Sequence, residues 1–90
     1  MELNFIKKGN VWEAEFEATS SFNIHIEMQS PSVVTVYQRG SSTGKYASIS
    51  SFNDKTPKSV FDRDFAALIY PKWIKVVSGS DVISSEVTFG

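Results

Sequence analysis

Few residues of this chain have the types and spacing that catalytic chemistry requires. His25 is the only histidine, and it stands between Ile24 and Ile26 in an alternating stretch that puts it on a polar face. A general base needs a positioned partner, and the sequence supplies none beside it. Because the chain contains no cysteine, thiolate chemistry, disulfides and cysteine-bound zinc are excluded. We therefore expect a structural or solvated role for His25.

Acidic loop residues are the next candidates, because Ca²⁺ takes oxygen ligands from such loops. Asp62 and Asp64 flank Arg63 without a calcium-loop spacing, so an ion pair is the simpler interpretation. Residues 40–45 (GSSTGK) lack the spacing, the final Ser/Thr and the following helix of a phosphate-binding loop. No serine stands in a nucleophile-elbow pattern. The sequence predicts a protein that is not an enzyme, with no catalytic residue, no metal site and no cofactor.

An acidic stripe and several aromatic residues remain as candidates for binding. Glu13, Glu15 and Glu17 alternate along one predicted strand, and neighbouring like charges cost stability unless a basic strand lies opposite. Lys7 and Lys8 on the preceding strand are the expected partners. A solvated face is favoured over a docking patch. Both tryptophans, at positions 12 and 73, stand within alternating apolar sets and are expected in the core.

Size and composition predict a single domain over residues 1–90. Hydrophobic residues make up 41% of the chain, and the net charge of −1 gives no long-range attraction to nucleic acid or to an anionic membrane. The first eight residues carry their lysines after a short apolar run, the reverse of a signal peptide, and no run reaches the roughly 20 apolar residues of a membrane span. We expect a chain made in the cytoplasm without a signal peptide.

Period-two alternation runs through most of the chain and is typical of strands with one wet face. The helix-forming composition of residues 13–18 keeps a helix there as the alternative. Pro31 is expected to end the third strand, and residues 65–70 are expected to form an extended connection with room for one helical turn. The predicted strands cover residues 3–8, 11–19, 22–29, 33–37, 45–52, 59–64, 73–78 and 82–89. About eight short strands with close turns predict an all-β protein, a single antiparallel β-sandwich that is jelly-roll-like.

The hairpin over residues 33–52 is the clearest of these elements. Its core positions are predicted to be Val34, Val36, Ile49 and Phe52, whereas its tip over residues 39–45 is polar and bears two glycines. Binding residues are commonly carried on such loops. We predict a partner-binding surface around the tip and the nearby tyrosines, formed by Tyr37, Arg39, Lys45, Tyr46 and Tyr70.

Three segments carry a resemblance to a known family. They are GNVWEAEFEATSSFNIHIE (9–27), VVTVYQRGSSTGKYASI (33–49) and FAALIYPKWIKVVSGSDVISSEVTF (65–89). Over nearly its full length the chain resembles small virion accessory proteins of tailed phages that infect gut Bacteroidetes. The resemblance implies a compact all-β protein that decorates or joins parts of the virion, often as a trimer, and it carries over no catalytic residue.

Two functions follow as hypotheses. The first is a non-enzymatic virion structural protein, a phage capsid decoration or head-associated accessory protein that acts through protein–protein contacts. Its partners would be phage capsid or other virion proteins and copies of itself, with a trimer favoured, and its location the virion. The alternative is a carbohydrate- or surface-binding β-sandwich module, to which the segment over residues 33–49 is more weakly similar; it would bind glycan with loop tyrosines such as Tyr46 and Tyr70.

Overall fold

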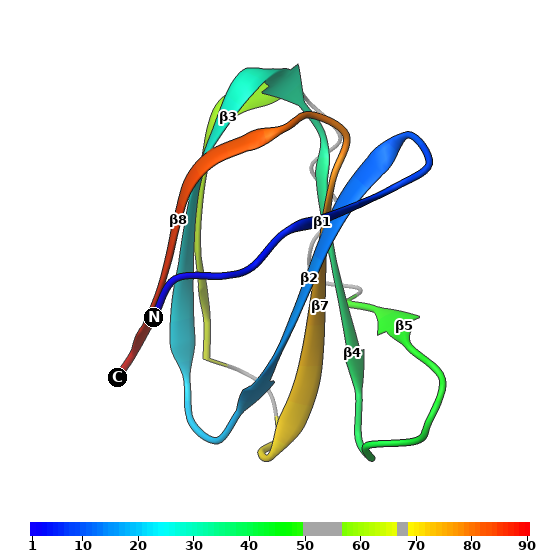
Figure 1. Cartoon of the computed structure of the whole chain (residues 1–90). Coiled ribbons are helices and arrows are strands. Elements are labelled where there is room, and N and C mark those ends of the chain that lie inside the picture. Colours follow the sequence, from blue (N-terminus) through cyan, green and yellow to red (C-terminus); the bar gives the residue numbers. More distant parts are fainter. Residues whose placement is uncertain (50–56, 67–68) are drawn as a thin grey trace.

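The structure is a computed structural model that describes residues 1–49, 57–66 and 69–90. It is an all-β protein whose strands form two antiparallel sheets packed face to face (Figure 1), so the predicted antiparallel β-sandwich is confirmed. The strands are β1 (Ile6–Lys8), β2 (Val11–Ala18), β3 (Phe22–Ser32), β4 (Val34–Arg39), β5 (Ala47–Ser48), β6 (Lys58–Phe65), β7 (Lys72–Ser78) and β8 (Val82–Phe89).

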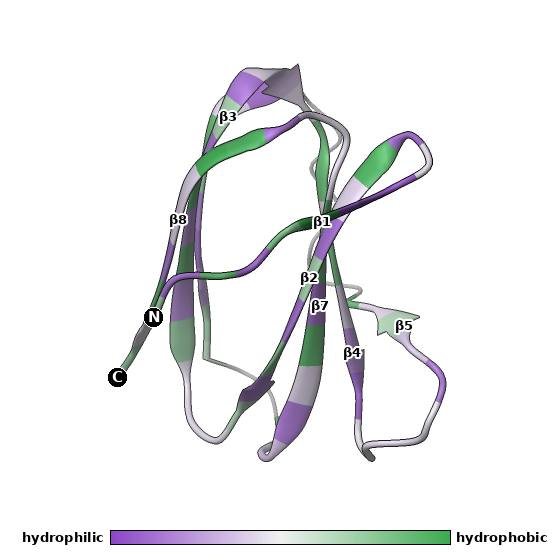
Figure 2. Ribbon diagram, viewed as in Figure 1, coloured by the Kyte–Doolittle hydropathy of each residue, from purple (hydrophilic) through white to green (hydrophobic). Residues whose placement is uncertain are grey.

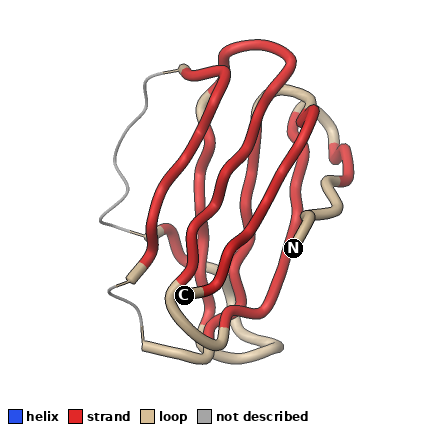
Figure 3. The backbone as a smooth tube through the Cα atoms, turned by 90° about the vertical axis from the view of Figure 1, so that its left-hand side faces the viewer, coloured by secondary structure: helices blue, strands red, loops and turns tan. Residues whose placement is uncertain are grey.

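The two sheets differ in size. One has five strands in the order β1-β2-β7-β4-β5, and the other has three in the order β6-β3-β8. Figure 3 turns the three-stranded sheet toward the viewer, with the larger sheet behind it. The chain passes from one sheet to the other between β2 and β3, β3 and β4, β5 and β6, β6 and β7, and β7 and β8. Segments far apart in sequence therefore lie side by side in both layers.

The core lies between the sheets and follows the predicted alternation. In β3, Phe22, Ile24, Ile26 and Met28 are all buried while the residues between them face outward, and Figure 2 shows this change of hydropathy along the strands. Each such side chain contributes about 1.5–3 kcal/mol on burial. The predicted core positions of the hairpin that the structure describes are also buried, namely Val34, Val36 and Ile49.

The β7–β8 turn joins the sheets through buried polar groups. The Ser78 hydroxyl, fully buried, donates to the Ser80 carbonyl at 2.7 Å and accepts from the Ser80 N–H at 3.2 Å. The Ser80 hydroxyl in turn accepts from the Ser30 N–H at 3.0 Å. These bonds satisfy polar groups that would be costly to bury unpaired, and they fix the far end of β3 against the turn.

Most strand boundaries differ from the prediction, several by a single residue, and β1 begins at Ile6 rather than at residue 3. Two further differences change the architecture. Pro31 does not end β3, which continues to Ser32 after a shift in register between Glu27 and Ser32. Proline is tolerated there because it is exposed and lies within the irregular part of the ladder, between Glu27 and Ser32. The returning strand of the hairpin is β5, which pairs with β4 over only two residues, Ala47 and Ser48. Phe52, predicted to belong to the core, lies outside the described residues, as do residues 67–68 of the predicted connection.

Candidate functional site

The outer face of the five-stranded sheet carries a group of aromatic and cationic side chains. The neighbouring strands β4 and β7 place Tyr37 opposite Lys75 and Arg39 opposite Trp73. Tyr46 comes directly before β5, which pairs with the end of β4. All five side chains are partly buried. We call Tyr37, Arg39, Tyr46, Trp73 and Lys75 the aromatic–cationic cluster.

Cations lie over the rings of this cluster. The Lys75 ammonium is 5.0 Å from the ring centre of Tyr37 and 4.8 Å from that of Tyr46, and the Arg39 guanidinium is 4.4 Å from the Tyr46 ring. Such contacts are attractive because the ring face is electron-rich. Arg39 also donates from Nη1 to the Gly44 carbonyl at 3.1 Å, so the tip loop and the sheet face hold the guanidinium together.

The acidic stripe borders the cluster and sets its electrostatics. Burial, followed by the hydrogen bond and negative charge of Glu15, raises the pKa of Tyr46 to about 12. The Lys75 ammonium lies 3.8 Å from the Glu13 carboxylate, and Glu15 stands directly opposite Lys75 in the ladder. The stripe is thus balanced from β7, and the Tyr46 phenol stays protonated well above neutral pH.

The expectation that Lys7 would balance the stripe is wrong. Lys7 lies opposite Trp12 rather than opposite a glutamate, and its ammonium stands 5.4 Å from the Trp12 ring. The reason is the two-residue turn between β1 and β2, in which Gly9 has a φ of 64°. A glycine at this position favours a tight hairpin turn and so fixes the register. Lys8 lies opposite Val11 and is exposed.

Trp73 and Lys75 are the members of the cluster that sequence reasoning missed. Trp73 was expected in the core, yet it shares the outer face with Lys75 while Ile74 and Val76 are fully buried. β7 lies between β2 and β4 in the same sheet, so side chains of these two strands flank its outward residues. Lys75 is the signal that could have placed the tryptophan outside, because residues two apart in a strand share a face and a charged residue favours the outer one.

The five predicted binding residues fall into two places. Tyr37, Arg39 and Tyr46 come together in the cluster, and Lys45 is exposed beside them on the tip loop. Tyr70 lies elsewhere, with its ring in edge contact with Phe22 at 6.5 Å and its hydroxyl donating to the Phe65 carbonyl at 2.8 Å. Burial raises the pKa of Tyr70, as expected for a phenol packed against the core.

The outer face of the three-stranded sheet carries a polar network instead. His25 Nδ1 lies 2.8 Å from Asp62 Oδ2, and the Asn23 amide donates to Asp62 at 2.7 Å and to Asp64 at 2.8 Å. The hydrogen bond to Asp62 is the main cause that raises the pKa of His25. The bonds from Asn23 and then His25 lower the pKa of Asp62. His25 thus lies on the polar face, with a charged partner supplied from β6.

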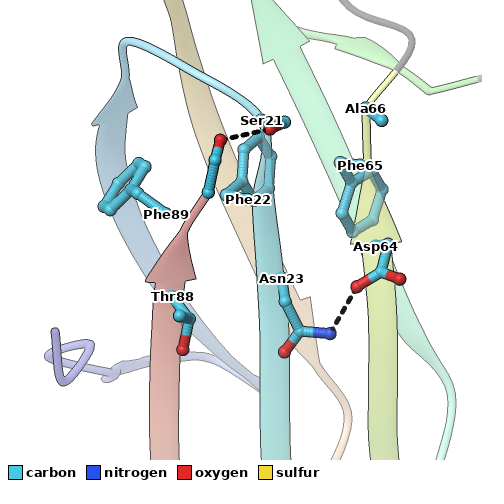
Figure 4. A pocket seen from close by; sticks show the side chains of 9 residues that line it. Ser21, Phe22, Asn23, Asp64, Phe65, Ala66, Thr88 and Phe89 are labelled. Atoms are coloured by element: carbon cyan, nitrogen blue, oxygen red, sulfur yellow. Dashed lines mark hydrogen bonds between the residues drawn. The ribbon is translucent and has the colours of Figure 1, made fainter.

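A pocket of about 290 Å³ opens at one end of the same sheet. It lies where β3 begins and where β6 and β8 end, so residues of both sheet faces reach it (Figure 4). Phe22, Phe65 and Phe89 supply aromatic surface, and Asn23 and Asp64 supply polar groups. Ser21 donates to the Gly90 carbonyl at 2.6 Å at its margin.

Comparison with known proteins assigns this chain to no family, so only its fold is described. No family model matches it, and neither a curated protein nor a solved structure gives a significant match. Within residues 1–49, 57–66 and 69–90, no three acidic or histidine side chains are grouped so as to hold a metal ion. The same residues include no helix long and apolar enough to cross a membrane. The chain is an antiparallel β-sandwich with a cluster of aromatic and cationic side chains on the outer face of its larger sheet.

Proposed function

We propose that this protein is a non-enzymatic accessory protein of a virion that binds a protein partner through the aromatic–cationic cluster. The observation that carries the proposal is the gathering of Tyr37, Tyr46, Trp73 and Arg39 on one sheet face. Tyrosine, tryptophan and arginine are the residues enriched at the energetic centres of protein interfaces. A surface of this composition binds by complementarity and needs no chemistry.

The cluster is ordered before any partner arrives. Arg39 is held between the Tyr46 ring and the Gly44 carbonyl, and the Lys75 ammonium lies over the rings of both Tyr37 and Tyr46. Side chains that are already immobilised lose little entropy on association, which favours tight binding. Among the described residues the Nε of Arg39 is buried and has no hydrogen-bond partner, so the guanidinium is packed into the face rather than extended into solvent.

The virion assignment rests on the resemblance of the sequence to tailed-phage accessory proteins. Under this proposal the partners are capsid or other virion proteins, and the chain associates with copies of itself, with a trimer favoured. Strand-rich accessory proteins of this kind act by surface contact. The location is the virion.

A carbohydrate- or surface-binding module is the second candidate, because three aromatic rings share one sheet face. Sugars stack on open ring faces, however, and here Lys75 and Arg39 already lie over Tyr37 and Tyr46. Those cations would have to leave before a sugar could stack in their place. The occupied rings favour a protein partner over a glycan.

The test is co-sedimentation with tailed-phage capsids assembled without this protein, together with the solution mass from light scattering. Arg39→Ala and Tyr46→Ala should each weaken capsid binding about tenfold or more, as central interface residues do, while the protein stays folded. Lys8→Ala is the matched control, because Lys8 is an exposed cation on the same sheet. A monomer that does not bind capsids would contradict the proposal.

A glycan array distinguishes the carbohydrate-binding function from the protein-binding function. Glycan binding that is lost in Tyr46→Ala and kept in Tyr70→Ala would favour the carbohydrate function, because only Tyr46 lies on the cluster face. A blank array together with capsid binding would leave the protein-partner function standing.

A further inference from the structure

We infer that the pocket at the ends of β3, β6 and β8 is a second contact site, which takes an arginine side chain of a protein partner. This site is on the smaller sheet and does not depend on the aromatic–cationic cluster. Its volume of about 290 Å³ is at the lower end of the range for ligand pockets, which begins near 300 Å³. It therefore suits one long side chain rather than a large cofactor.

The aromatic part of the pocket is a rigid set of rings. Phe22 stacks on Phe65 at 5.1 Å with an interplanar angle of 17°, and Phe89 meets Phe16 edge to face at 6.2 Å. Phe22 and Phe65 are nearly buried, but Phe89 is 39% exposed. An exposed ring next to a packed aromatic cluster offers a stacking surface, which both an apolar chain and a planar cation can use.

The polar part of the pocket is acidic. Asp64 accepts a hydrogen bond from the neutral Asn23 amide, and over the described residues its carboxylate makes no ion pair. Further carboxylates stand on the same sheet face, namely Glu27, Asp62 and Glu86. Of these, Asp62 and Glu27 face His25, and Glu86 faces the terminal amine. Asp64 is thus the carboxylate of the pocket left for a cation from outside.

Arginine fits this combination better than other cations. Its planar guanidinium can stack on an aromatic face and also make paired hydrogen bonds to a carboxylate, whereas the lysine ammonium is a compact, strongly hydrated charge. The aliphatic stem of arginine can remain against apolar surface while its head reaches a polar rim. Phe89 and Ala66 would contact the stem, and Asp64 would bind the head.

The test is an NMR titration of the whole chain with three blocked amino acids as probes. N-acetylarginine methylamide should shift the amide signals of residues 21–23, 64–66 and 88–90 in a saturable way. The citrulline analogue has nearly the same shape without the charge and should bind at least about tenfold more weakly, since a hydrogen bond to a charged group adds about 1.5–3 kcal/mol. The lysine analogue should also bind more weakly than arginine.

Variants decide the role of each half of the pocket. Asp64→Asn keeps the bond with Asn23 and should reduce arginine binding to the citrulline level, while Phe89→Leu should weaken arginine and citrulline alike. Asp81→Asn is the control, because Asp81 is an exposed carboxylate in the distant β7–β8 turn. The inference would be overturned if arginine and citrulline bound equally well, or if Asp81→Asn weakened arginine binding as much as Asp64→Asn does. It would also be overturned if no probe gave saturable shifts. Capsid binding through the larger sheet is measured separately, so either result can fail alone.

Discussion

The two outer faces of this sandwich are built from the same alternating strands but differ in what covers them. On the larger sheet, the cations of Arg39 and Lys75 lie over tyrosine rings, and the outward residues Tyr37, Trp73 and Lys75 are partly buried. On the smaller sheet, short polar side chains form hydrogen bonds in an exposed layer. The wet face of one sheet is thus a packed surface, and that of the other is a solvated network.

The difference follows from the number of strands. In the larger sheet three strands, β2, β7 and β4, have a neighbour on each side, so side chains of adjacent strands lie beside the outward residues of β7. In the smaller sheet only β3 has a neighbour on each side, and its outward residues Asn23 and His25 make polar contacts with carboxylates instead. A wider sheet can therefore build a preorganised surface of aromatic rings, which a partner can use as an interface centre.

The largest expected difference between the two outer faces is in how much a side chain on each contributes to the free energy of unfolding. Trp73→Ala should lower the free energy of unfolding by about 1–3 kcal/mol, less than the 3–5 kcal/mol of a fully buried aromatic residue because the ring is only partly covered. Urea denaturation measures it. Thr88→Ala, at an exposed outward position of the smaller sheet, should stay within about 0.5 kcal/mol of the wild type. Equal losses would mean that the two faces do not differ in packing.

Much of the fold follows from the sequence because alternation is a strong local signal. The strand over residues 82–89 was predicted with the observed bounds, and β3 buries the predicted residues. In β2, Ala14 and Ala18 are buried, but Trp12, also expected in the core, is only partly buried. Which strands are neighbours is a long-range property, and neither the β2–β7 nor the β4–β7 pairing leaves a mark in local sequence. For this reason the partner of Glu13 was misplaced.

The candidate site, like the fold, could be predicted from the sequence only where its residues are close together in the chain. Tyr37, Arg39 and Tyr46 belong to one hairpin, so their proximity follows from local pairing. Lys75 and Glu15 join them only through β7, which sequence reasoning could not place. The pocket depends on three strand ends that meet at one end of a sheet, and no local motif marks such a meeting.

A smaller effect than the loss of stability in Trp73→Ala is expected in the ionisation of Tyr46, on the larger sheet. Because burial and Glu15 raise its pKa to about 12, its phenol should ionise later than an ordinary tyrosine, near 10. This raised pKa stabilises the fold fully below about pH 10, and the contribution is lost as the pH rises through 12. Ultraviolet difference titration of the wild type and of Tyr46→Phe isolates the signal. Glu15→Gln should lower this pKa, and an unchanged value would remove Glu15 from the cluster.

The smallest expected effect is the pH dependence of the polar network on the other face. The pKa of His25 is raised above its usual 6.5 chiefly by Asp62, so its contribution to stability is complete below that pH and is lost as the pH rises through the raised value. The pKa of Asp62 is lowered below its usual 3.8, so its contribution is present above that pH and is lost as the pH falls through the lowered value. The network should therefore be strongest between pH 3.8 and 6.5.

NMR titration of the His25 ring together with urea midpoints at several pH values measures this window, and His25→Gln should flatten the upper limb. Asn23→Ala should raise the pKa of Asp62, because its amide is the largest cause of the lowering. Both groups are exposed to water, which screens their attraction, so the stability change should be far smaller than that of Trp73→Ala. A pH effect as large as the packing effect would reverse the comparison, because the solvated network would then hold the fold as strongly as the packed face does.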